Sequence, residues 1–263
     1  MKSISSPNNS IVKEAASLKE KKYRDTLGLF LVEGPNLVKE LLDQGGKARF
    51  IFLKAGAGAE AQEIALKAEG LAAVYELSPD VFSKIASDKS PQGIVAVAEK
   101  KTIGPEEFFR ETGNKDLLVL DRLQDPGNVG TLMRTAEALG FGGALLIKGT
   151  ADPYQPKAVK AAAGSVLRFP FIFCEDGKEA VSLLKAAGKK LYAACMTGSV
   201  CVRTADIKEN AAIVLGNEGN GVSDELIAAS ERLYIPMDGG TESLNAAAAG
   251  TIIMYEAKRQ RNL

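Results

Sequence analysis

The chain has 263 residues, of which 46% are hydrophobic and 25% are charged, and its 33 basic and 33 acidic residues give a net charge of zero. These fractions are typical of globular proteins with a buried core, and no apolar run approaches the roughly 20 residues that cross a bilayer. Histidine is absent, which excludes a histidine general base, a Ser-His-Asp triad and a histidine-ligated zinc. Cys174, Cys195 and Cys201 form no C-x-x-C pair, so they predict neither a metal site nor a disulfide framework and suit the reducing cytoplasm.

Short apolar runs alternate with helical patterns along the whole chain, which predicts an α/β fold. In the first part, strands are predicted at 29–32, 50–53, 72–75 and 94–98, and helices at 35–42, 60–68 and 79–85. Residues 101–115 are charged and rich in glycine and proline, so they predict a linker with a helical turn near 106–110. In the second part, strands are predicted at 117–120, 144–147, 169–173, 191–194, 212–215 and 233–235.

Positive charge is concentrated near both ends of the chain. The residues of the two clusters are Lys13, Lys19, Lys21, Lys22 and Arg24 in the first predicted helix, and Lys258, Arg259 and Arg261 in the last. A nucleic-acid binder of zero net charge must concentrate its cations in this way, because its affinity comes from neutralised phosphates. A solvated helix face explains either cluster equally well, and the helix dipole also favours the C-terminal one.

A turn in the first part resembles a dinucleotide-binding motif. The sequence from Gly56 to Ala61 fits G-x-G-x-x-A, follows a predicted strand, and precedes Glu76 by the spacing at which an acid binds a ribose. An ordinary turn between a strand and a helix explains the same residues. Nothing downstream resembles a hydride-transfer site, so a dinucleotide-dependent oxidoreductase is kept only as an alternative function.

Three loops rich in glycine, asparagine or proline each follow a predicted strand and precede a predicted helix. In the first, residues 121–141, Pro126 and Gly127 form a turn and Asn128 is the predicted N-cap of a helix. Arg134 lies one turn into that helix and off its apolar stripe, where it either faces a cleft or extends into solvent. Loops of this kind at the carboxyl ends of parallel strands are typical of ligand sites.

The second loop, residues 213–225, and the third, residues 234–261, contain more glycine. Gly216, Gly219 and Gly221 allow a ligand to approach the backbone closely, whereas Glu218 between them has no evident structural role. Ser223 is suited to capping the helix that follows. The last helix is predicted to begin near Ser243, and the small residues at 245–250 allow close packing against another backbone segment.

Together these loops resemble the signature motifs of the SpoU (TrmH) family of RNA ribose methyltransferases, in the SPOUT superfamily. The motifs are LDRLQDPGNVGTLMRTAEALGF, IVLGNEGNG and YIPMDGGTESLNAAAAG, in that order. Two N-terminal segments, KEKKYRDTLGLFLVEGPNLVKELL and SPQGIVAVAE, resemble the family's substrate-binding domain of ribosomal-protein type. The resemblance implies a small α/β RNA-binding domain at 1–100, a linker at 101–115, and a C-terminal α/β trefoil-knot domain at 116–263.

The same resemblance implies S-adenosylmethionine as cofactor, a homodimer, and a structured RNA substrate, with ribosomal RNA favoured over transfer RNA; it implies no metal and no membrane. The positions that match cofactor-binding residues are Leu215, Gly216, Asn217, Gly221, Ile235 and Leu244. The positions that match residues of catalysis and of the reacting ribose are Asn128, Arg134, Glu218, Ser243 and Asn245. Ala246 and Ala247 stand where family members often have Val-Ser, which puts a helix-start hydrogen bond of that serine in doubt.

The resemblance leaves the role of Arg134 open between a base in a dry site and a clamp on the adjacent phosphate, which then takes the proton. The clamp is favoured because a guanidinium pKa exceeds about 12 and its planar fork matches a phosphate. Glu218 is the other candidate base in a chain without histidine. A catalytically inactive RNA-binding relative is the alternative function, against which the intact Asn128, Arg134, Ser243 and Asn245 argue.

Overall fold

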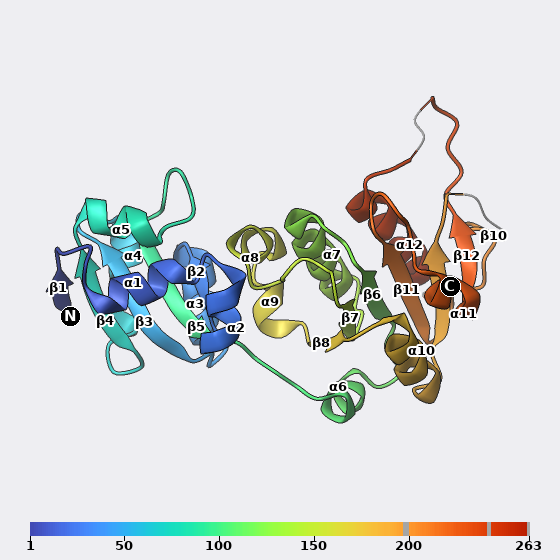
Figure 1. Ribbon diagram of the computed structural model, residues 1–263, viewed down its shortest axis with the longest axis horizontal. Helices are drawn as coiled ribbons and strands as arrows, with labels where there is room; N and C mark the ends of the chain where they lie inside the picture. Colours follow the sequence, from blue (N-terminus) through green and yellow to red (C-terminus); the bar gives the residue numbers. More distant parts are fainter. Residues whose placement is uncertain (197–199, 241–242, 262–263) are drawn as a thin grey trace. The chain divides into compact units, whose positions relative to one another are not determined.

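The computed structural model describes residues 1–196, 200–240 and 243–261 (Figure 1). The chain forms two compact units. The first contains Met1–Lys101 and Asp152–Arg168, and the second contains Thr102–Ala151 and Phe169–Leu263. Within the described residues, no helix has the length and apolar character needed to span a bilayer.

The first unit is built on a five-stranded sheet in the order β1-β4-β3-β5-β2. The strands are β1 (Lys2–Ile4), β2 (Leu29–Glu33), β3 (Ala48–Lys54), β4 (Ala73–Leu77) and β5 (Ile94–Glu99). β5 runs antiparallel to both of its neighbours, while β1, β4 and β3 are parallel to one another. The four strands predicted for this part are therefore confirmed, and only the short β1 was not predicted.

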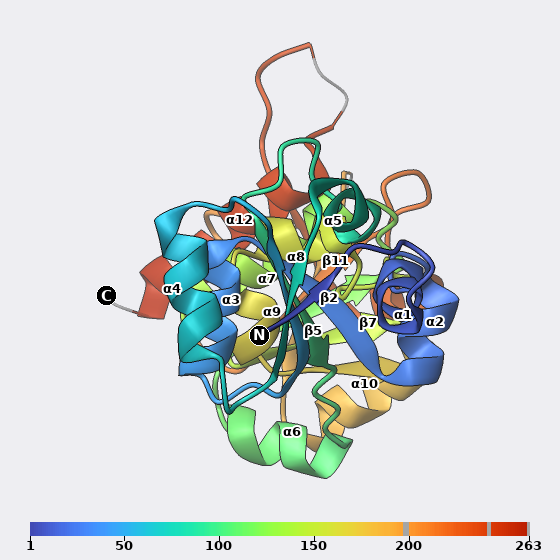
Figure 2. The same cartoon turned by 90° about the vertical axis from the view of Figure 1, so that its left-hand side faces the viewer.

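Helices cover both faces of this sheet (Figure 2). They are α1 (Ser10–Ser17), α2 (Lys21–Leu27), α3 (Pro35–Asp43), α4 (Ala59–Lys67) and α5 (Pro79–Ile85). α1 and α5 bury their apolar side chains, among them Val12 and Phe82, against one face, and α3 and α4 pack together on the other. The N-terminal basic run forms two short helices, because the first helix ends before Leu18 and the second begins at Lys21. The second helix, α2, is followed by Gly28 in the left-handed conformation.

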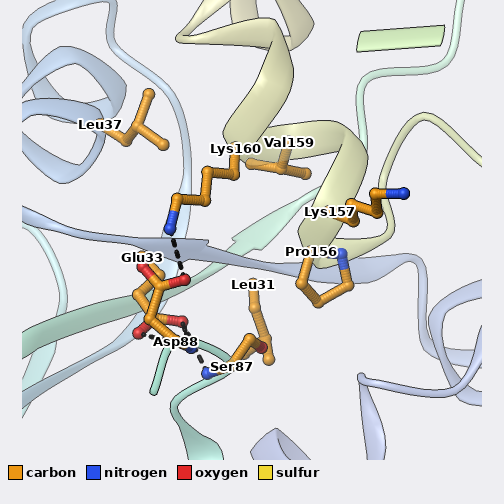
Figure 3. A pocket seen from close by; sticks show the side chains of 9 residues that line it. All are labelled: Leu31, Glu33, Leu37, Ser87, Asp88, Pro156, Lys157, Val159 and Lys160. Carbon is orange, nitrogen blue, oxygen red and sulfur yellow. Dashed lines mark hydrogen bonds and ion pairs between the residues drawn. The ribbon is translucent and has the colours of Figure 1, made fainter. Parts of the chain in front are cut away.

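Residues 152–168 complete the first unit with α8 (Pro156–Ala162) and α9 (Ser165–Arg168). α8 lies against β2 and closes a cavity of about 340 Å³ (Figure 3). Leu31, Leu37 and Val159 give the cavity an apolar wall, and Glu33 and Asp88 give it an acidic one. Lys160 reaches across from α8, and its Nζ lies 2.6 Å from Oδ1 of Asp88.

The second unit contains a seven-stranded parallel sheet in the order β10-β12-β9-β11-β6-β7-β8. The strands are β6 (Leu117–Asp121), β7 (Gly143–Ile147), β8 (Phe171–Cys174), β9 (Lys190–Ala194), β10 (Val200–Cys201), β11 (Ala211–Gly216) and β12 (Ser230–Tyr234). β6 and β7 are buried along their whole length, as expected of parallel strands with both faces covered. The six predicted strands and the α/β class are confirmed, whereas the two-residue β10 was not predicted.

Two groups of helices cover this sheet. α6 (Pro105–Thr112), α10 (Gly177–Ala186) and α11 (Asp224–Ala229) share one core, in which Phe108 of α6 is fully buried. The helix predicted near 106–110 is therefore present. α7 (Pro126–Ala138) and α12 (Ala246–Arg261) pack against each other and against β6 and β11. Gly250 permits this close approach, since a side chain there would overlap Leu215 and Leu132.

Candidate active site

The three predicted loops are joined at the carboxyl ends of β6 and β11. Asp121 ends β6 and pairs in register with Gly216, which ends the neighbouring β11. The Asp121 side chain is fully buried and accepts hydrogen bonds from the backbone N–H of Ser223, at 2.6 Å, and from Nε of Arg122, at 2.9 Å. One buried carboxylate thus ties the first loop to the second.

α7 begins three residues earlier than predicted, with its N-cap at residue 125 in place of 128. Asp125 is the N-cap, its Oδ1 accepts from the N–H of Gly127 at 2.7 Å, and Pro126 occupies the first helical position, which proline prefers. The prediction of Asn128 as N-cap is therefore wrong. Asp125 caps the helix because its side chain accepts a hydrogen bond from the first turn, and the proline after it is suited to the first helical position. Asn128 lies buried in the first turn, and its side chain is available for contacts with other loops.

The Glu218 carboxylate accepts hydrogen bonds from three donors of the first loop. It accepts from the N–H of Gln124 at 3.1 Å, from the N–H of Asp125 at 3.4 Å, and from Nδ2 of Asn128 at 3.0 Å. Oδ1 of Asn128 in turn accepts from Nδ2 of Asn245 at 3.1 Å. Because an ionised carboxylate only accepts hydrogen bonds, Glu218 fixes which way the Asn128 amide faces, and Asn128 then fixes Asn245.

The contacts of Glu218 also determine its ionisation. Partial burial alone would raise its pKa, but hydrogen bonds from Gln124, from its own backbone N–H, from Asn128 and from Asp125 lower the pKa below its ordinary value. The carboxylate is therefore ionised at neutral pH and is a weaker base than an ordinary glutamate. These contacts favour an orienting role over proton abstraction, and they supply the structural role that was not evident in the sequence.

The loop after β11 is closed on itself. Asn217 and Gly221 exchange two backbone hydrogen bonds, at 3.0 and 2.9 Å, and Oδ1 of Asn217 accepts from the N–H groups of Gly219 and Asn220 at 2.9 Å. Gly216 lies so close to this closure that an added Cβ would be 2.5 Å from the carbonyl oxygen of Gly221. Four predicted cofactor residues therefore lie close together at the end of β11: Leu215, Gly216 and Asn217 are consecutive, and Gly221 is hydrogen-bonded to Asn217.

The third loop carries the remaining predicted residues from β12 to α12; its residues 241–242 lie outside the described residues. Ile235 is half-buried directly after β12, and Ser243 and Leu244 are exposed. The last helix begins at Ala246 and not near Ser243 as predicted. Oδ1 of Asn245 caps α12 by accepting from the N–H groups of Ala247, at 2.9 Å, and Ala248, at 3.3 Å. The start of α12 is therefore capped without the serine hydroxyl that Ala247 lacks.

Arg134 lies on the exposed face of α7. Its guanidinium pairs with none of the side chains within 1–196, 200–240 and 243–261. Among the same residues, no three histidine, cysteine or acidic side chains gather into a metal-binding group. Sequence reasoning missed Asp121 and Gln124, although both stand in the first motif, between the end of the strand and the helix cap.

The structure also changes the interpretation of the basic clusters. Arg24 is 2% exposed and pairs with Asp152, so it cannot contact RNA phosphates as predicted. Lys13 and Lys22 remain exposed. In the C-terminal cluster, Arg261 pairs with buried Asp116.

A parallel sheet with three interlinked loops at one edge is the arrangement of a SPOUT methyltransferase domain, and comparison with known proteins agrees. Residues 116–255 match the model of the SpoU rRNA Methylase family, and residues 9–96 match the MRM3-like substrate binding domain. The chain belongs to the SpoU rRNA Methylase family and is a methyltransferase. The match to residues 9–96 includes the glycine-containing turn between β3 and α4, so the oxidoreductase alternative is set aside.

Individual relatives match over nearly the whole chain. The 23S rRNA (guanosine(2553)-2'-O)-methyltransferase RlmP of Bacillus subtilis (strain 168) is 35% identical over 98% of this chain and 100% of its own. The 23S rRNA (uridine(2479)-2'-O)-methyltransferase of Streptomyces viridochromogenes is 30% identical over 98% of this chain and 92% of its own. The AdoMet-bound rRNA methyltransferase of Sinorhizobium meliloti has a similar structure, with a TM-score of 0.88 and 32% identity over 98% of this chain and 97% of that one.

Proposed function

We propose that this protein transfers the methyl group of S-adenosylmethionine to a ribose 2'-hydroxyl of ribosomal RNA, in the cytoplasm. The observation that carries the proposal is the hydrogen-bonded series Glu218–Asn128–Asn245, which joins all three loops of the site. Two relatives are named for ribose methylation of 23S rRNA, one at a guanosine and one at a uridine.

The residues predicted to hold the cofactor offer apolar side chains and backbone hydrogen-bond donors, so they fit a ligand with both apolar and polar groups. Ile235 and Leu244 present partly exposed apolar side chains. Their backbone N–H groups hydrogen-bond to no described residue, so they are open to a ligand's acceptors. S-adenosylmethionine bound there would supply an electrophilic methyl group. The closed loop at Gly216–Gly221 would hold one side of it with main-chain atoms.

This chain's own residues would position the ribose and manage its proton. Asn128 and Asn245 are held in fixed orientations by Glu218, so their amides can orient the ribose without reorganising. Arg134 would clamp the neighbouring phosphate with its planar fork. As the 2'-oxygen takes the methyl carbon and the sulfur–methyl bond of the cofactor breaks to leave S-adenosylhomocysteine, the hydroxyl proton would pass to that phosphate, so the guanidinium need not act as the base. Ser243, exposed beside Leu244, would contact the substrate.

The proposal assigns RNA recognition to the domain at 1–100, with 101–115 as linker and 116–263 as methyltransferase domain. Lys13 and Lys22 are exposed on α1 and α2 and would neutralise phosphates. Replacing either one by alanine should raise the KM for RNA and reduce the slope of log affinity against log salt by about 1. Deleting residues 1–100 is a poor test, because Asp152 and Tyr154 are buried within the first unit.

A homodimer is part of the same proposal. Ile252 and Tyr255 lie one turn apart on α12 and are 40% and 60% exposed. Large apolar side chains side by side on a helix favour burial against a second protein surface, and we assign that surface to a second copy of this chain.

The decisive experiment combines binding with turnover. Calorimetry should show one S-adenosylhomocysteine bound per chain, and a chelator should not reduce binding. Ribosomal RNA from cells that lack the gene should accept a labelled methyl group at one ribose. Undetectable binding of S-adenosylhomocysteine at millimolar concentration would refute the proposal, as would methylation of a base in place of a ribose.

A further inference from the structure

The cofactor loop, defined as residues 217–223 between β11 and α11, is held at its far end by a buried carboxylate. Asp121 is the last residue of β6 and is fully buried. Its Oδ2 accepts from the N–H of Ser223 at 2.6 Å, and its Oδ1 and Oδ2 accept from Nε and Nη2 of Arg122 at 2.9 and 3.4 Å. Each of these partners donates a hydrogen bond, so a side chain with only one acceptor oxygen cannot satisfy them all.

The near end of the cofactor loop is held by the backbone of the next residue, Arg122. Nδ2 of Asn217 donates to the carbonyl oxygen of Arg122 at 2.9 Å. Because this contact fixes the nitrogen of the Asn217 amide, it also directs the amide oxygen to the N–H groups of Gly219 and Asn220, at 2.9 Å each. Two consecutive residues at the end of β6 therefore hold both ends of the loop that begins where the neighbouring β11 ends (Figure 1).

Arg122 makes this contact from an unfavourable backbone conformation. Its φ is 58°, in the left-handed region that residues other than glycine rarely adopt. Oγ1 of Thr150 accepts from the N–H of Arg122 at 3.0 Å and donates to the carbonyl of Leu120 at 2.9 Å, while the guanidinium pairs with Asp121. These contacts impose the conformation, and the conformation sets the direction of the Arg122 carbonyl. Backbone strain that surrounding contacts impose is concentrated at ligand sites.

We infer that Asp121 and Arg122 are positioning residues for S-adenosylmethionine, which hold the cofactor loop in its binding conformation before the cofactor arrives. The inference rests on the proposed function. A loop that adopts its binding conformation only part of the time raises the apparent Kd by the inverse of that fraction, and saturating ligand restores the conformation. Loss of either anchor should therefore raise the Kd and the KM for the cofactor more than it lowers kcat, whereas loss of a merely structural pair would lower the Tm alone.

The first test is the full-length variant Asp121→Asn. An amide oxygen can accept from Ser223 or from Arg122, and the amide N–H groups then face the other donor. We expect the Kd for S-adenosylhomocysteine in calorimetry to rise by about 10-fold or more, with a parallel rise in the KM for S-adenosylmethionine. At saturating cofactor, kcat should stay within about threefold of wild type. Hydrogen exchange of the amides of Gly219, Asn220 and Ser223 should accelerate without ligand and return to the wild-type rate when S-adenosylhomocysteine saturates the protein.

Asp116→Asn is the matched control. Asp116 directly precedes β6 and is also buried, and it accepts from the N–H of Ala211 at 2.8 Å and pairs with Arg261. It therefore makes the same kinds of contact as Asp121, but at the opposite end of the strand and with the first residue of β11 in place of the cofactor loop. Asp116→Asn should lower the Tm, as Asp121→Asn does, and leave the Kd for S-adenosylhomocysteine near wild type.

A second pair of variants tests the backbone of Arg122 apart from its side chain. Arg122→Gly and Arg122→Val both remove the guanidinium, but glycine adopts the left-handed conformation freely and a β-branched residue resists it. We expect the Kd for S-adenosylhomocysteine to be about 10-fold higher in Arg122→Val than in Arg122→Gly. This pair keeps Asp121, so it tests the inference even if Asp121→Asn does not fold.

A wild-type Kd in folded Asp121→Asn would overturn the inference, as would an equal rise in Kd in Asp116→Asn or equal Kd values in the two Arg122 variants. A fall in kcat with unchanged KM for the cofactor would do so too, because it would place the effect on the ribose and not on the cofactor. Failure of the proposed function is a different result, in which wild-type protein neither binds S-adenosylhomocysteine nor methylates RNA.

Discussion

Replacing Gly216 by alanine tests whether the loop after β11 holds the cofactor. The added methyl carbon would lie 2.5 Å from the Gly221 carbonyl oxygen and nearer still to the backbone of Gly221 and Val222. Ordinary carbon contacts need about 3.5 Å or more, so the backbone closure must move by about 1 Å. The two hydrogen bonds between Asn217 and Gly221 would then be lost or lengthened.

Two such hydrogen bonds contribute roughly 1–3 kcal/mol in total. If the Asn217–Gly221 hydrogen bonds hold the cofactor site in its binding conformation, the same free energy is lost from cofactor binding. That loss corresponds to an increase in Kd of about 5- to 150-fold. Calorimetric titration with S-adenosylhomocysteine measures this directly. Gly219→Ala is a matched control in the same loop, because the nearest atom to its Cβ is Oδ1 of Asn217 at an ordinary 3.5 Å. Wild-type affinity in Gly216→Ala, or an equal loss in Gly219→Ala, would refute the reasoning.

Arg134→Ala should leave cofactor affinity near wild type and reduce methyl transfer by more than ~100-fold. Loss of cofactor binding in this variant would show that Arg134 contacts the cofactor and not the RNA. Arg134→Lys should lose activity that higher pH does not restore if the residue is a clamp, whereas a base would recover activity towards the lysine pKa of roughly 10. Tyr255→Glu should convert the dimer to monomers in sedimentation experiments, and an unaffected dimer would exclude this face of α12. Iodoacetamide at pH 8 should modify Cys201 before Cys174 in mass spectrometry, because hydrogen bonds from Arg203 lower the pKa of Cys201 and burial raises that of Cys174 to about 12; equal rates would contradict this order.

The sequence by itself determined the elements and the place of the site. Continuous apolar runs predicted the buried strands, because a parallel sheet covered on both faces needs no polar residues within it. The three loops could be found because glycine, asparagine and proline mark the turns after such strands. The motif resemblance then indicated which of these residues belong to the site.

The tertiary structure decided which side chains work together. Asn128 was a reasonable cap by residue type, but Asp125 and Pro126 take that position, and Asn128 turns to Glu218, which is 90 residues away in the sequence. Arg24 stands in a run of exposed cations and appeared solvated, yet it is buried on Asp152, 128 residues away. Local patterns report the propensity of a segment, whereas the partner of a charged or amide group depends on what the fold brings beside it. Only the folded chain determines which polar groups lose water and must find each other.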